Sequence, residues 1–344
     1  MTIENKPAPD IQKQTGKMLN HFAGYVGLRA VQMGIKFGLI DELSRHPDGI
    51  SVDELAKAKD IDPFYAGVWA RAAYGAELLE LGDDGKFVLA PHMEQLLSNE
   101  DFPGYIGGLP KVLLSAEMFD VFEQNFSSGK RIWWDECSPE FIQGVSGTGR
   151  PFYSRMISGG FSKVPELQEA LERGIRVLEL ASGAGVGLVK MAQTYPNCEF
   201  LGVDGDSFSN ELAKGRAKSQ GVSDRVSLVE SSLEDLSRTE EFDLAFINIS
   251  MHECRDIDRV TENVRAALKP GGHFVISDFP FPESTEGCRT VPARIMSGIQ
   301  FFEALIDDQL MPTKAFVSLL NKHGFNDVDS FDISPVHSVI YGRK

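Results

Sequence analysis

An acidic residue inside a buried strand, followed by closely spaced glycines, is the feature of this chain best suited to bind a ligand. Residues 175–180 form an apolar run that carries Glu179, and Gly183 and Gly185 follow it directly. Glycines at such a turn let the backbone approach a ligand. A carboxylate between two leucines is costly to bury unless a cation or a hydrogen-bond donor meets it. The pattern therefore predicts a nucleotide-type cofactor site where this strand ends.

A second strand of the same kind supports this interpretation. Residues 198–204 are again mostly apolar and end in Asp204, which follows Gly185 at roughly the 20-residue interval where an acid binds ribose hydroxyls. The apolar residues between the two strands recur at helical spacing until Tyr195 and Pro196. Strand, helix and strand then bring both acids to the carboxyl edge of a parallel sheet. The alternative, that the glycines only form a turn, explains less well why they lie beside both acids.

The glycine spacing separates this site from a dinucleotide-binding one. The fingerprint Gly-x-Gly-x-x-Gly is absent, and the chain has Glu179-x-Ala181-x-Gly183-x-Gly185-x-Gly187 instead. With this pattern the chain resembles class I S-adenosylmethionine-dependent methyltransferases, apart from Ala181, where glycine is usual. The resemblance implies S-adenosyl-L-methionine as cofactor and S-adenosyl-L-homocysteine as product. It places Glu179, Gly183, Gly185 and Asp204 among the cofactor-binding residues.

The resemblance continues to the end of the chain. Residues 226–233 look like the third strand and the adenine-contacting turn, with Ser232 where the family often has aspartate, and residues 242–248 look like the fourth strand. The sequence LKPGG at 268–272, before an apolar strand, is a specific cue of the family. The implied fold is α/β, a Rossmann-like doubly wound sheet of the seven-stranded methyltransferase type. Further cofactor contacts expected from the resemblance are Ser232, Leu233, Asn248 and Tyr153.

The amino-terminal part has the pattern of a winged helix. Ser51 and Glu54 form a capping box before a helix over 52–59, a second helix begins at Pro63, and alternation around Asp84 and Gly85 predicts a hairpin. The block resembles the dimerisation domain of small-molecule O-methyltransferases. That resemblance, and an apolar helix over residues 18–37, predict a homodimer formed through this domain.

Composition limits the possible partners. The formal net charge is −16, whereas a DNA reader needs a basic face, so we expect no nucleic-acid partner. The sequence contains neither a long apolar run nor a secretory signal, which predicts a cytoplasmic protein without a membrane partner. The four cysteines show no metal-ligand spacing, and no metal is expected. The predicted division is a disordered segment 1–14, a winged-helix-like dimerisation domain 15–100, a helical linker and substrate lid 101–173, and a catalytic domain 174–344.

The catalytic and substrate-binding residues are less well defined. His252 lies just beyond the fourth strand and is the candidate base, although a gapless comparison with the plant-type enzymes puts Ser250 at that position. A structural role for His252 is as probable as a catalytic one, and transfer without a dedicated base stays open. Residues 152–156 resemble a segment that packs beside cofactor and acceptor in these enzymes. The candidate substrate-binding residues are Phe152, Met156, Trp133, Met251, Met296 and Phe301.

Three functions remain open at this stage. The leading one is methyl transfer from S-adenosylmethionine to a hydroxyl of a small, aromatic metabolite. The second keeps the cofactor but uses it for non-methylating chemistry such as decarboxylation or hydroxylation. The third is a ligand-sensing winged-helix regulator, which the negative charge disfavours.

Overall fold

The computed structural model describes residues 10–344, and the chain divides between Pro110 and Lys111 into two compact units. Most of the segment predicted to be disordered, residues 1–9, lies outside the described residues. Helix α1 (Ile11–Lys36) begins inside that segment, because the side chain of Asp10 caps it by accepting a hydrogen bond from the backbone N–H of Gln12. Residues 11–14 are therefore helical.

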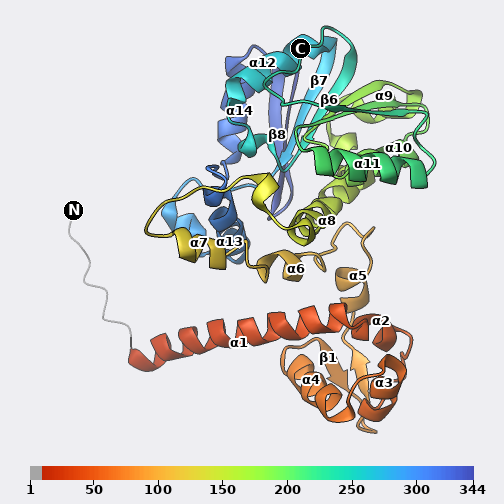
Figure 1. The fold of residues 1–344 in the computed structure, drawn as a ribbon, viewed down its shortest axis with the longest axis vertical. Coiled ribbons are helices and arrows are strands. Elements are labelled where there is room, and N and C mark those ends of the chain that lie inside the picture. The colour runs from red at the N-terminus through yellow and green to blue at the C-terminus, as the bar shows by residue number, and fades with distance from the viewer. Residues whose placement is uncertain (1–9) are drawn as a thin grey trace. The chain divides into compact units, whose positions relative to one another are not determined.

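The first unit is a small helical region with one hairpin (Figure 1). The Ser51–Glu54 capping box forms as predicted, and the indole Nε1 of Trp69 donates a hydrogen bond of 2.9 Å to the carbonyl of Ala30. A compact apolar core forms around Trp69. Its elements after α1 are α2 (Leu39–Ser44), α3 (Val52–Lys59), α4 (Pro63–Gly75), β1 (Leu79–Leu81), β2 (Phe87–Leu89) and α5 (Met93–Leu97).

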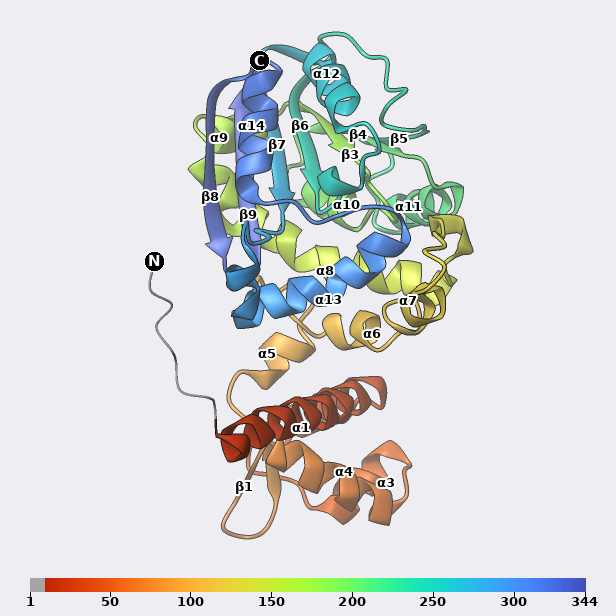
Figure 2. The same cartoon turned by 90° about the vertical axis from the view of Figure 1, so that its left-hand side faces the viewer.

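The second unit is built on one seven-stranded sheet with the order β5-β4-β3-β6-β7-β9-β8 (Figure 2). Strands β3 to β7 pair in parallel, and β9 pairs antiparallel to both β7 and β8. The predicted α/β fold with a doubly wound sheet of seven strands is confirmed. The strands are β3 (Arg176–Leu180), β4 (Glu199–Asp204), β5 (Val226–Glu230), β6 (Phe242–Asn248), β7 (Leu268–Asp278), β8 (Asn326–Ser334) and β9 (His337–Arg343).

Helices cover both faces of this sheet because its buried strands alternate their apolar side chains between two cores. Val177 of β3 belongs to the core under α9 (Leu167–Arg173), α10 (Val186–Thr194) and α11 (Ser207–Ser219). Leu178 belongs to the core under α12 (Ile257–Ala267) and α14 (Thr313–Lys322). The remaining helices are α6 (Leu109–Leu113), α7 (Asp120–Asn125), α8 (Pro139–Arg155) and α13 (Val291–Leu305).

The segment predicted as a separate linker belongs largely to this second unit. Helix α8 and α13 cross beside the carboxyl ends of the parallel strands (Figure 2). Tyr153, Met156 and Phe161 are buried in the same core as Val177, so this segment is fixed to the sheet by burial of its apolar side chains. Over residues 10–344, no helix combines the length and apolarity needed to cross a bilayer.

Candidate functional site

A cavity of about 600 Å³ lies at the carboxyl ends of the parallel strands in the second unit. One side is formed by the ends of β3, β4 and β6 and by the loops that follow them. The other side is formed by α8 and the turn before it. The residues that line the cavity include Trp133, Trp134, Ile142, Val145, Gly149, Tyr153, Gly183, Gly187, Asp204, Leu233, Asn248, Ser250, Glu253 and Arg255.

Asp204 links the end of β4 to the glycine loop, residues 181–185 between β3 and α10. Its Oδ2 accepts a hydrogen bond of 2.8 Å from the backbone N–H of Gly183, and its Oδ1 accepts one of 2.9 Å from Asp206. Burial raises the pKa of the Asp204 carboxyl. Gly183 adopts a left-handed φ of 51°, and a Cβ there would meet no atom within 4 Å. The loop thus presents bare backbone to the cavity at Gly183, as the sequence predicts for a cofactor site.

The two other glycines of the pattern have packing roles. A Cβ on Gly185 would come within 2.8 Å of the Cβ of Ala213 on α11, so Gly185 lets the loop pack on that helix and is absent from the cavity lining. A Cβ on Gly187 would fall 1.9 Å from the ring of Tyr153. Gly187 therefore makes room for a tyrosine that lines the cavity.

Glu179 is buried beneath the cavity. Its Oε1 accepts a 2.5 Å hydrogen bond from the Tyr153 hydroxyl, and among the described residues its Oε2 has no hydrogen-bond partner. Burial raises the pKa of Glu179, the hydrogen bond from Tyr153 lowers it in part and the charge of Asp204 raises it, and together they bring this pKa to about 8. Glu179 is thus a buried acid whose second oxygen lacks a donor.

This pKa predicts a pH dependence of stability that Glu179→Gln removes. Between the ordinary pKa of 4.5 and about 8 the folded chain holds a proton on Glu179 that the unfolded chain has lost, so the free energy of unfolding falls as pH rises through this window. Glutamine keeps an acceptor for Tyr153 and does not ionise. We expect the free energy of unfolding of the variant to fall less between pH 5 and pH 8.5 than that of the wild type, by an amount on the order of a few kcal/mol. Urea unfolding at the two pH values measures this difference.

The exposed Glu169 provides the control for this measurement. Glu169→Gln removes one carboxylate from the surface of the same unit and should leave the pH dependence of unfolding as it is in the wild type. An equal effect of both substitutions would contradict the assignment to Glu179.

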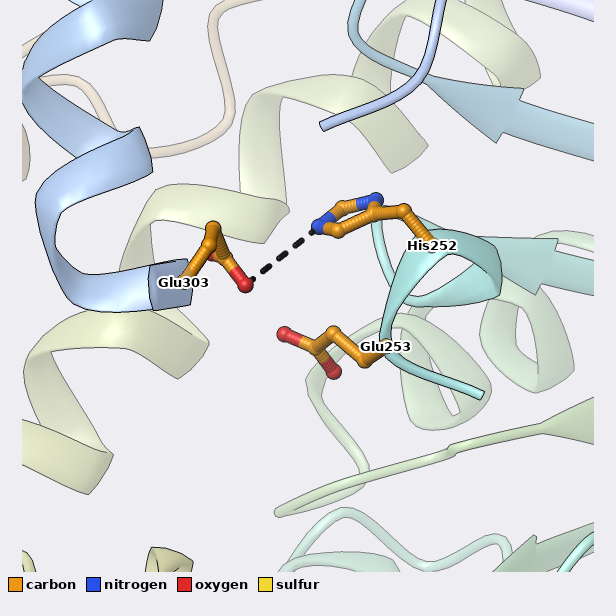
Figure 3. Close-up of side chains that lie close together, drawn as sticks. All are labelled: His252, Glu253 and Glu303. Atoms are coloured by element: carbon orange, nitrogen blue, oxygen red, sulfur yellow. Dashed lines mark ion pairs between the residues drawn. The ribbon is translucent and has the colours of Figure 1, made fainter. Parts of the chain in front are cut away.

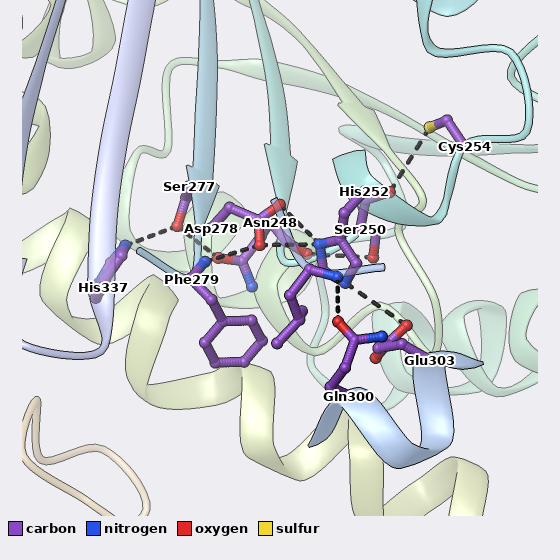
Figure 4. Close-up of polar contacts among 11 residues, drawn as sticks. Asn248, Ser250, His252, Cys254, Ser277, Asp278, Phe279, Gln300, Glu303 and His337 are labelled. Atoms are coloured by element: carbon purple, nitrogen blue, oxygen red, sulfur yellow. Dashed lines mark hydrogen bonds and ion pairs between the residues drawn. The ribbon is translucent and has the colours of Figure 1, made fainter. Parts of the chain in front are cut away.

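Asn248 is oriented by a chain of buried polar groups (Figure 4). The Nε–H of Arg155 donates to Nδ1 of His337 at 2.9 Å, so the other ring nitrogen of His337 carries the proton and meets the Ser277 hydroxyl at 2.8 Å. Ser277 in turn donates to Oδ1 of Asn248 at 2.8 Å. Burial and the charge of Arg155 lower the pKa of His337 to about 2, which keeps its ring neutral. Asn248 lines the cavity with its side chain oriented in this way.

His252 is absent from the cavity lining, and its ring faces Glu303 (Figure 3). Its Nδ1 is 3.0 Å from both carboxylate oxygens of Asp278, and its Nε2 is 3.7 Å from Oε2 of Glu303 on α13. Burial acts to lower the pKa of His252, but the carboxylates of Asp278 and Glu303 outweigh it and raise the pKa well above 6.5. The residue that lines the cavity here is its neighbour Glu253, which the sequence did not single out. A catalytic role for His252 stays a prediction.

Of the predicted substrate-binding residues, Trp133 lines the cavity. Its ring lies 3.9 Å from the guanidinium carbon of Arg255. Phe301 is instead 40% exposed and packs against Phe119 and Phe122. Four others are buried in the core and absent from the cavity lining, namely Phe152, Met156, Met251 and Met296.

The predicted cofactor residues mostly meet at one end of the cavity. Gly183, Asp204, Leu233, Asn248 and Tyr153 line it. Ser232 does not line the cavity. Its hydroxyl donates a hydrogen bond to the carboxylate of Asp235 and accepts one from the backbone N–H of Asp235. Trp134, the neighbour of Trp133, also lines the cavity, and lining residues that the sequence did not indicate include Ile142, Val145 and Ser146. The signal for Ile142 and Val145 was an apolar stripe at helical spacing, which is equally typical of a core helix.

The lining chemistry fits the expected cofactor. Four acids line the cavity, namely Asp204, Asp206, Glu230 and Glu253, against the one cation Arg255 among the described lining residues. S-adenosylmethionine carries a sulfonium and an ammonium, which a wall of this sign attracts.

Comparisons by sequence find methyltransferases. Residues 171–315 match the family described as a methyltransferase domain. A 2-phytyl-1,4-naphtoquinone methyltransferase from Trichormus variabilis is 30% identical over 115 residues, which are 33% of this chain and 50% of that protein. A malonyl-acyl-carrier-protein O-methyltransferase from Priestia megaterium is 29% identical over 105 residues, 30% of this chain and 37% of that protein. The chain spans half or less of the length of these two curated relatives.

Comparisons by structure cover nearly the whole chain. A candidate O-methyltransferase from Nostoc punctiforme superposes with a TM-score of 0.75 at 16% identity, over 99% of this chain and 100% of that one. Human N-acetylserotonin methyltransferase, solved with S-adenosylmethionine, gives 0.68 at 15% identity over 98% and 99%. The mitomycin 7-O-methyltransferase MmcR gives 0.69 at 14% identity over 97% and 99%. At such identities the likeness establishes the fold.

These findings agree with the resemblance read from the sequence. The matched domain contains β3, the glycine loop and Asp204, which form the cofactor end of the cavity. The domain and the fold together support S-adenosylmethionine as the cofactor. The chain therefore contains a methyltransferase domain and has the fold of the S-adenosylmethionine-dependent small-molecule O-methyltransferases.

Proposed function

We propose that this protein transfers the methyl group of S-adenosylmethionine to a hydroxyl of a small aromatic metabolite. The observation that carries the proposal is the single cavity with two different ends. We assign the end lined by the glycine loop, Asp204 and Asn248 to the cofactor and the end lined by Trp133, Trp134 and Ile142 to the acceptor. A volume of about 600 Å³ lies within the range of small-molecule sites.

The cofactor end offers groups suited to each part of S-adenosylmethionine. Asp204 stands where it can accept hydrogen bonds from ribose hydroxyls, since it ends β4 beside Gly183. The amide NH₂ of Asn248 suits a carboxylate, and Glu179 with Asp204 suits the cationic end. Leu233 supplies apolar surface for the adenine ring.

The acceptor end is apolar and aromatic. Trp133 and Trp134 can stack on a flat substrate, and Ile142 and Val145 of α8 extend the apolar wall. The bound cofactor supplies an already activated methyl group on a positively charged sulfur. The chain then mainly has to align the acceptor oxygen with that methyl group and exclude water.

Two alternatives from the sequence are less well supported. The structural relatives named above are methyltransferases, which does not favour non-methylating use of the cofactor. The regulator function would need a basic surface for DNA, and the formal net charge of −16 opposes it.

Calorimetric titration of S-adenosylmethionine and S-adenosylhomocysteine, followed by turnover with a panel of phenols, tests the proposal. We expect micromolar binding of both and formation of S-adenosylhomocysteine with a methylated phenol as coproduct. Matched anilines and thiols in the panel test the acceptor atom. Binding of neither ligand to the folded protein would overturn the cofactor assignment, and turnover restricted to amines would overturn the hydroxyl assignment.

We also propose that the protein is a homodimer formed through its amino-terminal unit. Helix α1 exposes a row of large apolar side chains, with Phe22 62% and Val26 56% exposed. Such apolar area is rarely left uncovered.

The four free cysteines support a reducing compartment, so a cytoplasmic location is part of the same proposal.

Phe22→Glu with Val26→Glu is expected to convert the dimer to a monomer, because two buried charges in an apolar interface are costly to desolvate. Light scattering after size-exclusion chromatography should report half the wild-type mass. Lys13→Glu, a charge change at an exposed site of the same helix, is the control and should stay dimeric. A monomeric wild type would refute the proposal.

A further inference from the structure

One arginine lines a cavity whose other charged residues are acidic. Arg255 is the one cation among the described lining residues, which include four acids. Its backbone is held on both sides, because the turn Met251–Glu253 lies before it and Asp256, the N-cap of α12, follows it. The sequence did not indicate this residue, and the proposed methyl transfer does not yet give it a role.

Trp133 holds the guanidinium of Arg255 in place. The guanidinium carbon lies 3.9 Å from the centre of the Trp133 ring, which is close enough for a cation–π contact. The main chain of Trp133 is itself fixed, since its N–H donates a 2.9 Å hydrogen bond to Glu136. A guanidinium that stacks on an aromatic ring can still donate hydrogen bonds in its own plane. Trp133 therefore orients Arg255 without using its N–H donors.

These donors have no acceptor in the part of the chain that the structure describes. Over residues 10–344 the guanidinium of Arg255 contacts the ring of Trp133 and interacts at longer range with the charge of Asp308. Burial and the charge of Glu303 raise the pKa of Asp308 to about 7, and the charge of Arg255 opposes this rise. Arg255 is also exposed, so a ligand that enters the cavity can reach its donors.

The surroundings of Arg255 are apolar and aromatic. Because it contacts Trp133, Arg255 belongs to the end of the cavity that we assign to the acceptor. Trp134, Ile142 and Val145 line the same cavity and offer surface to a flat ring. A ligand that uses both features has an aromatic ring and an anionic group attached to it.

An anion at this end would also meet Glu253, which lines the cavity. Burial and the charge of Glu303 outweigh the charge of His252 and raise the pKa of Glu253 well above its usual value. A raised pKa favours the neutral acid, which repels an anion less than a carboxylate does. Glu253 therefore opposes an anionic ligand less than its residue type suggests.

We propose that the acceptor is an aromatic carboxylic acid and that Arg255, positioned by Trp133, binds its carboxylate. The planar fork of a guanidinium matches the two oxygens of a carboxylate and can donate to both. The acids at the cofactor end, Asp204 among them, disfavour the reversed orientation of such a substrate. The inference rests on the proposed function, because it names the substrate class of the same cavity.

Binding of matched acids and amides to the full-length protein tests the proposal. The probes are 3,4-dihydroxybenzoate and 4-hydroxycinnamate, each beside its neutral carboxamide, titrated by ligand-observed NMR in the presence of S-adenosylhomocysteine. We expect the wild type to bind each acid at least about tenfold more tightly than its amide. Arg255→Gln should bring this ratio close to one. Arg255→Lys, which keeps the charge but loses the fork, should give an intermediate ratio.

Variants of Trp133 test its positioning role. Trp133→Leu removes the ring on which the guanidinium stacks, so it should lower the acid-to-amide ratio as well as the affinity for both probes. Trp133→Phe keeps an aromatic ring and should restore most of the ratio. A residue that only shaped the cavity would change both affinities alike and leave the ratio unchanged.

Arg259 is the matched control. It is exposed on α12, four residues beyond Arg255, and absent from the cavity lining. Arg259→Gln should keep the wild-type ratio, and an equal loss in both arginine variants would overturn the proposal. Wild type that binds neither acid, or that binds acid and amide equally in both pairs, would overturn it too. So would Arg255→Gln that binds S-adenosylhomocysteine more weakly while its acid-to-amide ratio stays at the wild-type value.

Turnover of the same probes with S-adenosylmethionine separates this proposal from the proposed function. Preferential binding of the acids without any methyl transfer would leave the carboxylate site standing and overturn the proposed function alone. Methyl transfer to phenols with no preference for the acids would overturn this inference alone. Thermal unfolding shows whether each variant is folded, and Arg255→Gln, at an exposed residue, is the variant least disruptive to packing.

Discussion

Asp204→Ala is expected to weaken S-adenosylmethionine binding at least about 100-fold in calorimetric titration. Both oxygens of Asp204 accept backbone hydrogen bonds, from Gly183 at 2.8 Å and from Asp206 at 2.9 Å. Hydrogen bonds to a charged acceptor contribute roughly 1.5 to 3 kcal/mol each. Alanine removes both of them together with the proposed ribose contact. The backbone that shapes the cofactor end of the cavity is then no longer held.

Two companion variants show which part of this loss belongs to the ligand. Asp204→Asn keeps one acceptor oxygen and should bind better than the alanine variant but worse than wild type. Glu199→Gln, at the exposed start of the same strand, should bind like wild type. Asp204→Ala that stays folded and binds the cofactor with unchanged affinity would refute the assignment of this end of the cavity.

The cofactor end of the site could be predicted because its chemistry is encoded locally. Glu179 and Asp204 each lie at the carboxyl end of a buried strand, and glycines follow the first of them. In a parallel sheet all such strand ends meet at one edge, so one-dimensional spacing already fixes the neighbourhood in space. The seven-stranded fold follows from the same alternation of strands and helices. The packing roles of Gly185 and Gly187 could not be predicted from the sequence, because their contacts with Ala213 and Tyr153 join different elements.

The acceptor end could not be predicted in the same way. Phe152 and Met156 have the residue types of a substrate wall, yet both are buried and absent from the cavity lining, while Ile142 and Val145 of α8 line the cavity. A helix that is apolar on more than one face gives no sequence signal for which face meets a cavity and which meets a core. The burial of α8 against the sheet decides it, and that burial depends on residues far along the chain.

The neighbourhood of His252 shows a related limit. From the sequence, His252 could be placed at the edge of the sheet where ligands bind, with a catalytic base and a structural residue as equal alternatives. Its environment depends on Asp278 and Glu303, which come from β7 and α13. Their carboxylates surround the ring from both sides, so its electrostatics are a property of the tertiary fold. The sequence pattern could indicate the position of this histidine but not its partners.

Gly187→Ala is expected to destabilise the fold by roughly 2 to 4 kcal/mol and to weaken cofactor binding with it. The new Cβ would lie 1.9 Å from the ring of Tyr153, which is only 7% exposed and packs against Phe246. The ring has to move, and its hydroxyl then loses the 2.5 Å hydrogen bond to Glu179. A buried acid without any donor adds to the cost of the clash. Urea unfolding and calorimetric titration measure the two effects.

A matched glycine and a double variant make this prediction specific. Gly215 lies in α11 with no atom within 4 Å of a built Cβ, so Gly215→Ala should raise the free energy of unfolding by about 1 kcal/mol through helix propensity alone. Combining Gly187→Ala with Tyr153→Ala removes the ring that the new methyl group meets. The two losses should then be less than additive, because both act on one contact. Strict additivity, or stabilisation by Gly187→Ala alone, would show that Tyr153 does not occupy the space above Gly187.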